Sequence, residues 1–375
     1  MKVLQVSCEG LGNGGVQNVI MNICREITEI KFDILLFTSE KRYYDNEFER
    51  LGGNIYRIPN YEGKNRIRKK IDYYIRFLRI FKGTYKILRN NGPYDAIHCH
   101  NELESGICNF AAFFAGIKIR ISHAHTVGNK FSKRNFFGYS YKKLLQIVMN
   151  KFSNIKIGCT TRAIKSLYGE KYCGKTNTFI IPNSIDLRKF NQYKENKISV
   201  KSSEVSIVNV GRYEENKNQL FLVRAFSYVL AMYPNSKLRL MGYGEEYRAK
   251  IEKEIERLNI TNNIEFIPHD SDIIKLLSDA SIFILPSISE GYGIVLLEAQ
   301  AMNVPCLVSD TVPKEVDCGL CKFISLTLGE ERWAEEAVKV INQEPVFNLN
   351  IDKLNSLDNN NYIKVIRNLY KGEES

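Results

Sequence analysis

Two glutamates in one short segment have the spacing and the surroundings to bind hydroxyl groups. Glu290 lies in the loop sequence SISEGYG, and Glu298 stands eight residues later inside the apolar run IVLLEAQA. Gly291 and Gly293 leave the loop backbone open to a phosphate or a sugar, and the helix that follows offers free N–H groups and a dipole that favours an anion. We therefore expect Glu290 to accept hydrogen bonds from sugar hydroxyls. Glu298, on an apolar helix, needs a donor, and a ribose diol would supply two hydrogen bonds.

Two basic residues could bind the phosphates of the same ligand. Arg212 and Lys217 lie in VGRYEENKNQ, after an apolar run that predicts a strand and before a predicted helix. Arginine offers a planar fork of donors and lysine a compact charge, a combination that suits a diphosphate. Simpler alternatives stay open at this point. Glu290 could be a solvated loop residue, Glu298 could pair with a nearby arginine or lysine, and the two basic residues could be ordinary surface charge.

Two further motifs are less specific. GNGGVQNV places Gly15 at the predicted start of a helix, but its glycine spacing is neither that of a dinucleotide fingerprint nor that of a P-loop. Asp270 and Asp272 in HDSD have a spacing that some sugar transferases use to hold a metal. They precede the helical run IIKLLSDA, so we expect them to cap that helix instead.

Four histidines are clustered in the first half of the chain. In SHAHTV we expect one of His123 and His125 to face the core and the other to face the ligand, and His98 and His100 in IHCHNE have the same ambiguity. A histidine is more often a hydrogen-bonded structural residue than a ligand. No pair of these histidines has the spacing of metal ligands on a helix, so we expect no metal site here.

Alternating strands and helices must position these residues. Apolar runs such as KVLQVS, FDILLFTS and IRISHAHT predict strands, and helical runs separate them, a pattern typical of a parallel α/β sheet covered on both faces. The pattern restarts at VSIVNVG after the polar stretch 191–204. The sequence therefore predicts two Rossmann-like domains, residues 1–190 and 191–375, facing each other across a cleft. Ligands bind at the carboxyl ends of such strands, which places the predicted site in that cleft.

The charge is unevenly distributed over the chain. The net charge is +11, but residues 1–190 hold 32 basic and 15 acidic residues and the remainder is net acidic. The segment 63–92 mixes ten basic residues with aromatic and aliphatic ones, and 128–143 adds five basic and five aromatic residues. Such stretches suit an anionic membrane surface, although a solvated basic face over an ordinary core is the alternative.

Composition excludes several protein classes. The chain has 375 residues with 44% hydrophobic and 25% charged residues, which is ordinary for a folded protein of two domains. The nine cysteines are scattered, so we expect free thiols in a reducing cytosol rather than a disulfide framework. No segment has the length and hydrophobicity of a membrane span or a signal peptide, so we expect a cytoplasmic protein.

Taken together, these motifs resemble those of retaining glycosyltransferases of family 4, which belong to the GT-B class. The resemblance covers nearly the whole chain and rests on GGVQ, His125-Thr126, IPNSID, GRYEENK and SEGYG with LEA, of which the Glu290–Glu298 spacing is the most specific. SDTVPKEV and FISLTLGEERWAEEAV are similar to the branch that builds bacterial capsular polysaccharide or exopolysaccharide. Two positions depart from the usual pattern. Ser184 stands where glycine is common, and Thr126 stands where aspartate is common.

The resemblance implies a role for each motif. Residues 191–375 would bind a nucleotide-sugar, most often a UDP-sugar, and a last helix could pack back on residues 1–190, which would face the acceptor and the membrane. The acceptor would be a saccharide on a polyprenyl diphosphate, at the inner face of the cell membrane. No metal would be needed, because basic residues and a helix N-terminus take the leaving charge. The implied site residues are Gly15, His125, Arg212, Lys217, Glu290, Gly293, Ile294 and Glu298, of which His125, Arg212, Lys217 and Glu290 would act on the reacting groups.

Two other functions remain open from the sequence. A different enzyme on the same fold, such as a nucleotide-sugar epimerase or a phosphorylase with a soluble substrate, would leave the basic first half without a role. A nucleic-acid-binding protein would use the basic and aromatic residues, but would leave the two glutamates, Arg212 and Lys217 unexplained. We therefore expect no nucleic-acid partner.

Overall fold

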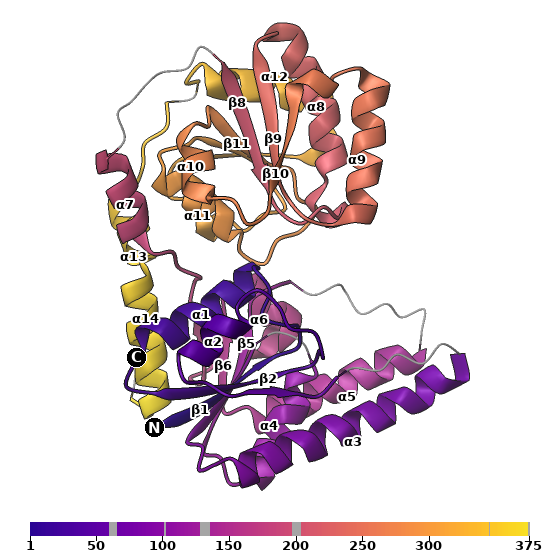
Figure 1. The fold of residues 1–375 in the computed structure, drawn as a ribbon, viewed down its shortest axis with the longest axis vertical. Helices are drawn as coiled ribbons and strands as arrows, with labels where there is room; N and C mark the ends of the chain where they lie inside the picture. The colour runs from indigo at the N-terminus through magenta and orange to yellow at the C-terminus, as the bar shows by residue number, and fades with distance from the viewer. Residues whose placement is uncertain (60–65, 101–102, 128–135, 197–203, 345, 374–375) are drawn as a thin grey trace. The chain divides into compact units, whose positions relative to one another are not determined.

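The chain divides into two compact units, each built around one parallel sheet. The computed structural model describes residues 1–59, 66–100, 103–127, 136–196, 204–344 and 346–373 (Figure 1). The first unit comprises Met1–Asn183 and Asn360–Ser375, and the second comprises Ser184–Asn359. The division therefore falls after residue 183 and not after residue 190. The reason is local: the backbone N–H of Ile185 donates to Leu357 O, and Ile185 O accepts from the N–H of Asn359, so this segment pairs with the end of the second unit.

The sheet of the first unit has seven parallel strands in the order β3-β2-β1-β4-β5-β6-β7. Crossover helices connect them, as the alternation in the sequence predicts. The strands are β1 (Lys2–Ser7), β2 (Lys31–Leu36), β3 (Ile55–Arg57), β4 (Ala96–His100), β5 (Ile119–Ala124), β6 (Ile155–Gly158) and β7 (Thr178–Ile180). The helices are α1 (Gly15–Glu26), α2 (Asp45–Arg50), α3 (Arg66–Asn90), α4 (Ser105–Phe114), α5 (Phe136–Phe152), α6 (Thr161–Leu167), the short 3-10 turn η1 (Glu170–Tyr172), and α14 (Asn359–Lys371) at the chain's end.

The two faces of this sheet carry different side chains. Leu4, Val6 and Ile97 point to one face, where they form an apolar core with Ile107 of α4 and Leu145 of α5. Residues of the opposite parity point to the other face. That face is polar at its centre, and its contents are described with the site below.

Helix α3 only partly fits the membrane-facing helix expected from segment 63–92. Leu78 is 55% exposed, but Ile80 is fully buried in the core and Phe77 and Phe81 are half-buried against it. The side chains of residues 66–74, and most of the second segment, 128–143, lie outside the described residues. No helix in the described part of the chain is long and apolar enough to cross a membrane.

The second unit holds six parallel strands in the order β10-β9-β8-β11-β12-β13. Its core joins strand residues such as Ile207 and Leu240 to Phe226 and Trp333 from two helices. The strands are β8 (Val205–Val210), β9 (Ser236–Gly242), β10 (Ile264–Pro268), β11 (Ile282–Leu285), β12 (Cys306–Ser309) and β13 (Cys321–Ile324). The helices are α7 (Leu187–Asn196), α8 (Gln219–Met232), α9 (Glu245–Leu258), α10 (Ile273–Ser278), α11 (Ile294–Ala301), α12 (Gly329–Ile341) and α13 (Ile351–Ser356). Short 3-10 turns are η2 (Glu215–Lys217), η3 (Thr261–Asn263), η4 (Lys314–Val316) and η5 (Leu326–Leu328).

Candidate active site

Glu290 and Lys217, 73 residues apart in sequence, form an ion pair in the second unit. Lys217 Nζ lies 2.6 Å from Glu290 Oε1, and the two side chains are 18% and 9% exposed. The hydroxyl of Ser287 donates to the same oxygen at 2.6 Å. A carboxylate this buried requires such partners. The structure thus brings together one predicted anion-binding residue and one predicted hydroxyl-binding residue.

The order of the strands in the sheet explains why Lys217 and Glu290 lie together. Lys217 follows β8 and Glu290 follows β11, and these strands are neighbours that run parallel, so their carboxyl ends lie side by side. Two asparagines flanking Lys217 bind the two loops together. Asn216 Nδ2 donates to Ser289 O at 2.8 Å, and Asn218 Nδ2 donates to Pro286 O at 3.2 Å. The ion pair is therefore held by bonds between the loops as well as by its own attraction.

The loop from Glu290 leads directly into α11. Gly293, the residue before this helix, has a φ of +90°, a conformation that favours glycine because a side chain there is strained. Ile294 is the first residue of the helix, and the N–H of Leu296 donates to Gly293 O at 2.9 Å, so the N–H groups of Ile294 and Val295 are the ones left without a carbonyl partner within the helix. This is the geometry of a phosphate-binding helix N-terminus.

Arg212 does not join the ion pair. Its side chain is 54% exposed, and its guanidinium contacts Glu214 at 3.4 Å. The Arg212 carbonyl accepts from Gln219 Nε2 at 2.9 Å, which fixes the backbone and leaves the long side chain in solvent. The structure therefore leaves the diphosphate-binding role of Arg212 as a prediction.

Glu298 lies within α11, between the buried residues Leu297 and Ala299. Burial raises the pKa of the Glu298 carboxyl to about 7. No described residue forms a hydrogen bond or an ion pair with this carboxylate, so the alternative in which Glu298 pairs with a nearby arginine or lysine finds no support here. A carboxylate without a partner in the protein is able to accept hydrogen bonds from a ligand.

In the first unit, the structure places Gly15 at the first position of α1, directly after the loop that follows β1. Gly14 precedes it with an extended backbone, and the side chain of Gln17 folds back over Gly14, where an added Cβ would lie 2.5 Å from Gln17 Oε1. Gln17 Nε2 also donates to Glu9 Oε2 at 3.1 Å. Gly14 is thus closely covered by the side chain of Gln17.

His125 lies in a continuous line of seven buried polar residues, which we call the histidine chain: Gln5, His98, His100, His123, His125, Asn183 and Tyr370. Its members come from β1, β4, β5 and the residue directly after β5, the segment after β7 and the C-terminal helix α14. Burial is the first cause that lowers the pKa of His125 to about 4 and of His98 to about 3, and it also lowers the pKa values of His100 and His123 well below the ordinary value. All four imidazoles are therefore neutral at neutral pH.

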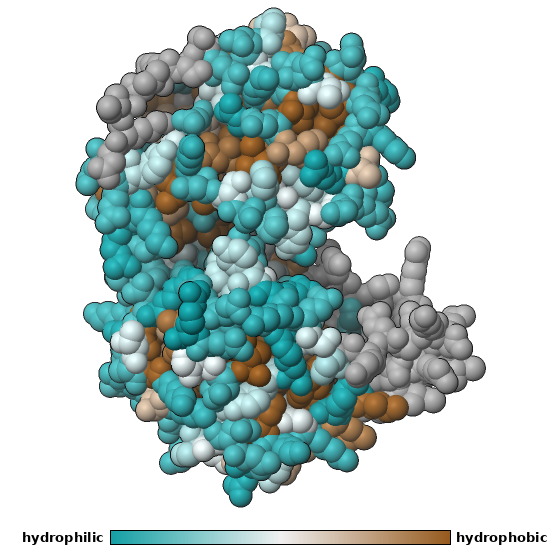
Figure 2. Space-filling view, in the orientation of Figure 1, coloured by the Kyte–Doolittle hydropathy of each residue, from teal (hydrophilic) through white to brown (hydrophobic). Residues whose placement is uncertain are grey.

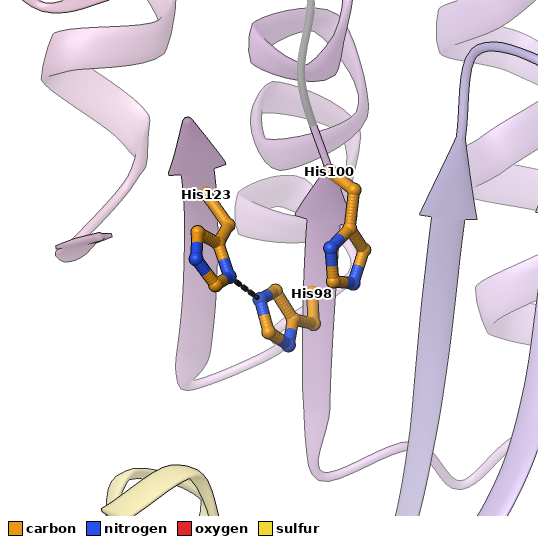
Figure 3. A group of neighbouring side chains, drawn as sticks. All are labelled: His98, His100 and His123. Carbon is orange, nitrogen blue, oxygen red and sulfur yellow. Dashed lines mark hydrogen bonds between the residues drawn. The ribbon is translucent and has the colours of Figure 1, made fainter. Parts of the chain in front are cut away.

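The expectation that His123 and His125 face opposite sides is wrong. Residues two apart on a strand point to the same face, and these two rings stack with centroids 3.8 Å apart. His98 and His100 stack in the same way at 4.1 Å. All four histidines thus lie on one side of the sheet. Figure 3 shows three of them, with His98 and His123 joined by a hydrogen bond across neighbouring strands.

The cluster has the dimensions of a metal site but not its chemistry. His98, His100 and His123 each offer a ring nitrogen, and these atoms lie within 4.8 Å of one another. However, both nitrogens of His98 and of His100, and Nδ1 of His123, already take part in hydrogen bonds. A divalent ion would have to break those bonds. We interpret the cluster as a hydrogen-bonded network.

Several residues of these sites carried no recognisable signal in the sequence. Ser287, Asn216 and Asn218 are short polar residues in loops, where such residues are common. Gln5 and Tyr370 lie at opposite ends of the chain, and only the fold brings them together. Asp272 does behave as expected, because its carboxylate accepts from the N–H groups of Ile274 and Lys275 at the start of α10.

Comparison with known families gives matches to both halves of the chain. Residues 13–189 match the family described as "Glycosyltransferase Family 4", and residues 191–317 match the one described as "Glycosyl transferases group 1". Together the two matches span both units.

Curated relatives are similar over much of their length. EpsF of Bacillus subtilis, named as a glycosyltransferase, is 28% identical over 89% of this chain and 86% of its own. An Escherichia coli UDP-Gal:α-D-GlcNAc-diphosphoundecaprenol α-1,3-galactosyltransferase is 27% identical over 63% of this chain and 62% of its own. The Staphylococcus aureus capsular polysaccharide biosynthesis glycosyltransferase CapH is 23% identical over 81% and 80%.

Among solved structures, the crystal structure of Anabaena HepE in complex with UDP and glucose superposes with a TM-score of 0.74, at 15% identity, over 99% of both chains. At this identity the similarity concerns the fold, which is GT-B, with two parallel α/β sheets. The fold class expected from the sequence is thereby confirmed.

Proposed function

Since this chain belongs to glycosyltransferase family 4, among homologues in capsular polysaccharide and exopolysaccharide biosynthesis, we propose that it transfers a sugar from a UDP-sugar, with retention, to a lipid-linked saccharide. The observation that carries the donor half of this proposal is the ion pair between Lys217 and Glu290 beside the N-terminus of α11. It places a cation, a hydroxyl-accepting carboxylate and free backbone N–H groups on two adjoining loops.

Each group has a distinct part in donor binding. The Lys217 ammonium has three N–H donors, so it can contact a phosphate oxygen while it keeps Glu290 in place. Glu290 retains acceptor capacity for hydroxyls of the transferred sugar, and the carboxylate of Glu298 accepts from the ribose. The backbone of Gly293 and Ile294 receives the sugar–phosphate, and Gly15 contributes from the first unit. Lys217, Arg212 and the helix N-terminus stabilise the charge of the departing UDP, so we propose that no metal is required.

A binding screen tests the donor half. Thermal unfolding is followed with UDP, GDP, ADP and their sugar conjugates, with and without EDTA, because a ligand of the folded state raises the melting temperature. We expect a selective increase with one UDP-sugar that EDTA does not change. Lys217→Met should abolish the increase. Glu252→Gln, which removes one partner of an exposed ion pair on α9, is the control and should preserve it.

The outcomes separate the proposal from its alternatives. If no nucleotide raises the melting temperature, the proposed donor site is refuted. An increase that requires a divalent ion would keep the transferase but overturn metal independence. A UDP-sugar that is bound and then converted without an acceptor would favour an epimerase.

The acceptor half is supported by the Escherichia coli relative, whose name specifies a diphosphoundecaprenol-linked substrate, and by the surface of the first unit. Helix α4 packs against both α3 and α5, and the three helices expose large apolar side chains. Figure 2 shows hydrophobic residues on the visible face of this unit. The exposed apolar residues on these helices are Ile75, Leu78, Phe113, Phe114, Leu144 and Ile147. Exposed Lys82, Lys86 and Lys142 accompany them. Apolar side chains framed by lysines suit the interface of an anionic membrane, and we propose peripheral binding at its cytoplasmic face.

Vesicle flotation tests this surface. We expect the protein to float with vesicles that contain anionic lipid and not with neutral ones. Ile147→Glu, at a residue 63% exposed on α5, should reduce flotation, whereas Ile351→Glu, at a residue 62% exposed on α13 of the second unit, should not. Equal flotation of the two variants would refute the surface, and binding to RNA without binding to vesicles would favour a nucleic-acid partner.

A further inference from the structure

The seven members of the histidine chain are joined by six consecutive hydrogen bonds, and three of these connect His125 to Tyr370 of the C-terminal helix. His125 Nδ1 contacts Asn183 Oδ1 at 3.3 Å, and His125 Nε2 contacts His100 Nδ1 at 2.9 Å. His100 Nε2 contacts Gln5 Oε1 at 2.9 Å, and Gln5 Nε2 donates to the Tyr370 hydroxyl at 2.9 Å. That hydroxyl contacts His98 Nδ1 at 2.7 Å, and His98 Nε2 contacts His123 Nδ1 at 3.2 Å.

The proton positions along this line depend on one another. A neutral imidazole has one N–H donor and one acceptor nitrogen, so a donor at one end of each ring requires an acceptor at the other. The hydrogen bonds of the histidine chain must therefore all point the same way, from donor to acceptor, along its whole length. If both Gln5 Oε1 and Asn183 Oδ1 accepted from the histidines between them, His100 and His125 would together hold an extra proton, which their burial opposes.

Gln5 is better placed than Asn183 to set the direction. Among the described residues, Gln5 has two side-chain partners, each at 2.9 Å, while the side chain of Asn183 has a single contact, with His125 at 3.3 Å. With Gln5 accepting from His100, the proton of His100 lies on Nε2 and its Nδ1 accepts from His125. The proton of His125 then lies on Nε2 and its Nδ1 is an acceptor, so the side-chain amide of Asn183 must be turned to present its nitrogen to this ring in place of Oδ1. At the other end, Tyr370 donates to His98, and His98 donates to His123.

We propose that Tyr370 and Gln5 are positioning residues that fix His125 in its Nε2-protonated tautomer and hold its ring. The link begins on α14 at the far end of the chain, so the C-terminal helix would help to build the site in the first unit. This inference rests on the proposed function, in which His125 lies beside the transferred sugar. It also changes the expected role of His125: both of its ring nitrogens are bonded within the protein, so it acts by its position and not as a base.

The C-terminal helix offers a matched pair of variants. Tyr370 and Tyr362 both lie on α14, and they are 1% and 5% exposed. Tyr370 bonds two members of the chain, whereas the Tyr362 hydroxyl has no hydrogen-bond partner among the described residues. Tyr370→Phe removes the hydroxyl that joins Gln5 to His98. Tyr362→Phe removes a similarly buried hydroxyl that lies outside the histidine chain.

Nitrogen NMR of the histidine rings gives a readout that is independent of activity. The protein has five histidines, and 15N shifts report which ring nitrogen carries the proton. In the wild type we expect His125 to be neutral and protonated on Nε2. Tyr370→Phe should shift the ring nitrogens of His125, although its own contacts are intact, and Tyr362→Phe should not. An Nδ1-protonated His125, or a His125 unaffected by Tyr370→Phe, would overturn the proposal.

Kinetics then test the functional part of the inference. Tyr370→Phe should lower kcat by roughly tenfold, a fraction of the hundredfold that a misplacement of about 1 Å can cost, and leave the KM for the donor unchanged. Tyr362→Phe should leave both unchanged. If the His125 signals move and kcat does not, the positioning role is refuted. If the wild type transfers no sugar, the proposed function fails while NMR still decides the tautomer. Gln5→Met, which breaks the line nearer to His125, gives the same readouts should Tyr370→Phe unfold.

Discussion

Replacing Glu298 by glutamine should stabilise the ligand-free protein above neutral pH and weaken donor binding. Burial raises the pKa of this carboxyl from 4.5 to about 7. Between these values the folded state keeps a proton that the unfolded state has lost, so the free energy of unfolding falls as pH rises from 4.5 to 7, and the loss is complete above pH 7. A neutral amide avoids that loss.

The magnitude follows from the shift. The rise from 4.5 to about 7 corresponds to about 3 kcal/mol in full, and we take about half of it because part of the side chain reaches solvent. For a unit of this size, about 1.5 kcal/mol raises the melting temperature by roughly 3–6 °C. At pH 5 the gain should nearly vanish, because the carboxyl is then protonated in the folded state.

Thermal unfolding of Glu298→Gln at pH 5 and pH 8 measures this difference. Glu246→Gln, at a side chain 95% exposed, is the control and should change neither melting temperature. Titration with UDP at pH 8 should show weaker binding by Glu298→Gln, since an amide offers one acceptor oxygen to the diol where a carboxylate offers two. A gain that is the same at both pH values would refute the assignment to an ionised carboxylate. Unchanged UDP affinity would refute the ribose contact.

Three further predictions follow from the same contacts. Lys217→Met should lower the free energy of unfolding by about 3 kcal/mol, because Glu290 is left buried beside Ser287 without its cation. Urea denaturation measures this change, and a loss below about 1 kcal/mol would show that the ion pair is solvated. Gly293→Ala should cost about 1 kcal/mol through its φ of +90° and should weaken UDP binding in calorimetry, whereas Gly12→Ala, where an added Cβ meets nothing within 4 Å, should do neither. The melting temperature should fall as pH drops from 6.5 toward 4, because the pKa of His125 is lowered to about 4 and that of His98 to about 3. The unfolded state then gains protons that the folded state excludes, and each of these two histidines lowers the free energy of unfolding by about 2 kcal/mol at pH 5. His269→Gln, at an exposed position, is the control and should leave the dependence of melting temperature on pH unchanged.

Much of the fold could be predicted because periodicity is a local property. Strands and helices alternate in the sequence, and parallel sheets place loops such as 286–293 at their carboxyl ends, so Glu290 and Lys217 could be assigned to one edge before the structure. The order of the strands then made them neighbours. The direct ion pair between them, with Ser287 as a third member, depends on side-chain positions that no periodicity specifies.

The remainder was missed for two different reasons. The opposite placement of His123 and His125 was an error of parity, since residues two apart share a face, and correct counting along the strand would have found it. The resemblance implied that a last helix could pack back on the first half, as α14 does, but the link from Gln5 to Tyr370 joins side chains 365 residues apart and could not be found by counting along a strand. The boundary near 183 was missed for the same reason, because the backbone bonds of Ile185 reach Leu357 and Asn359.

The state of these two sites also bears on how a sugar acceptor would lose its proton. His125 has both ring nitrogens bonded and a pKa of about 4, so it cannot take a proton at neutral pH without breaking a bond and acquiring an unfavourable buried charge. Glu290 is an acceptor whose charge is already shared with Lys217 and Ser287. Under the proposed function, a proton that neither residue accepts is left to the phosphate of the departing UDP, which develops negative charge as the bond to the sugar breaks. Lys217 then has opposing effects, because its charge stabilises the leaving group and also lowers that phosphate's basicity. The distance that Ser287 and Glu290 impose on the ammonium would set the balance between the two.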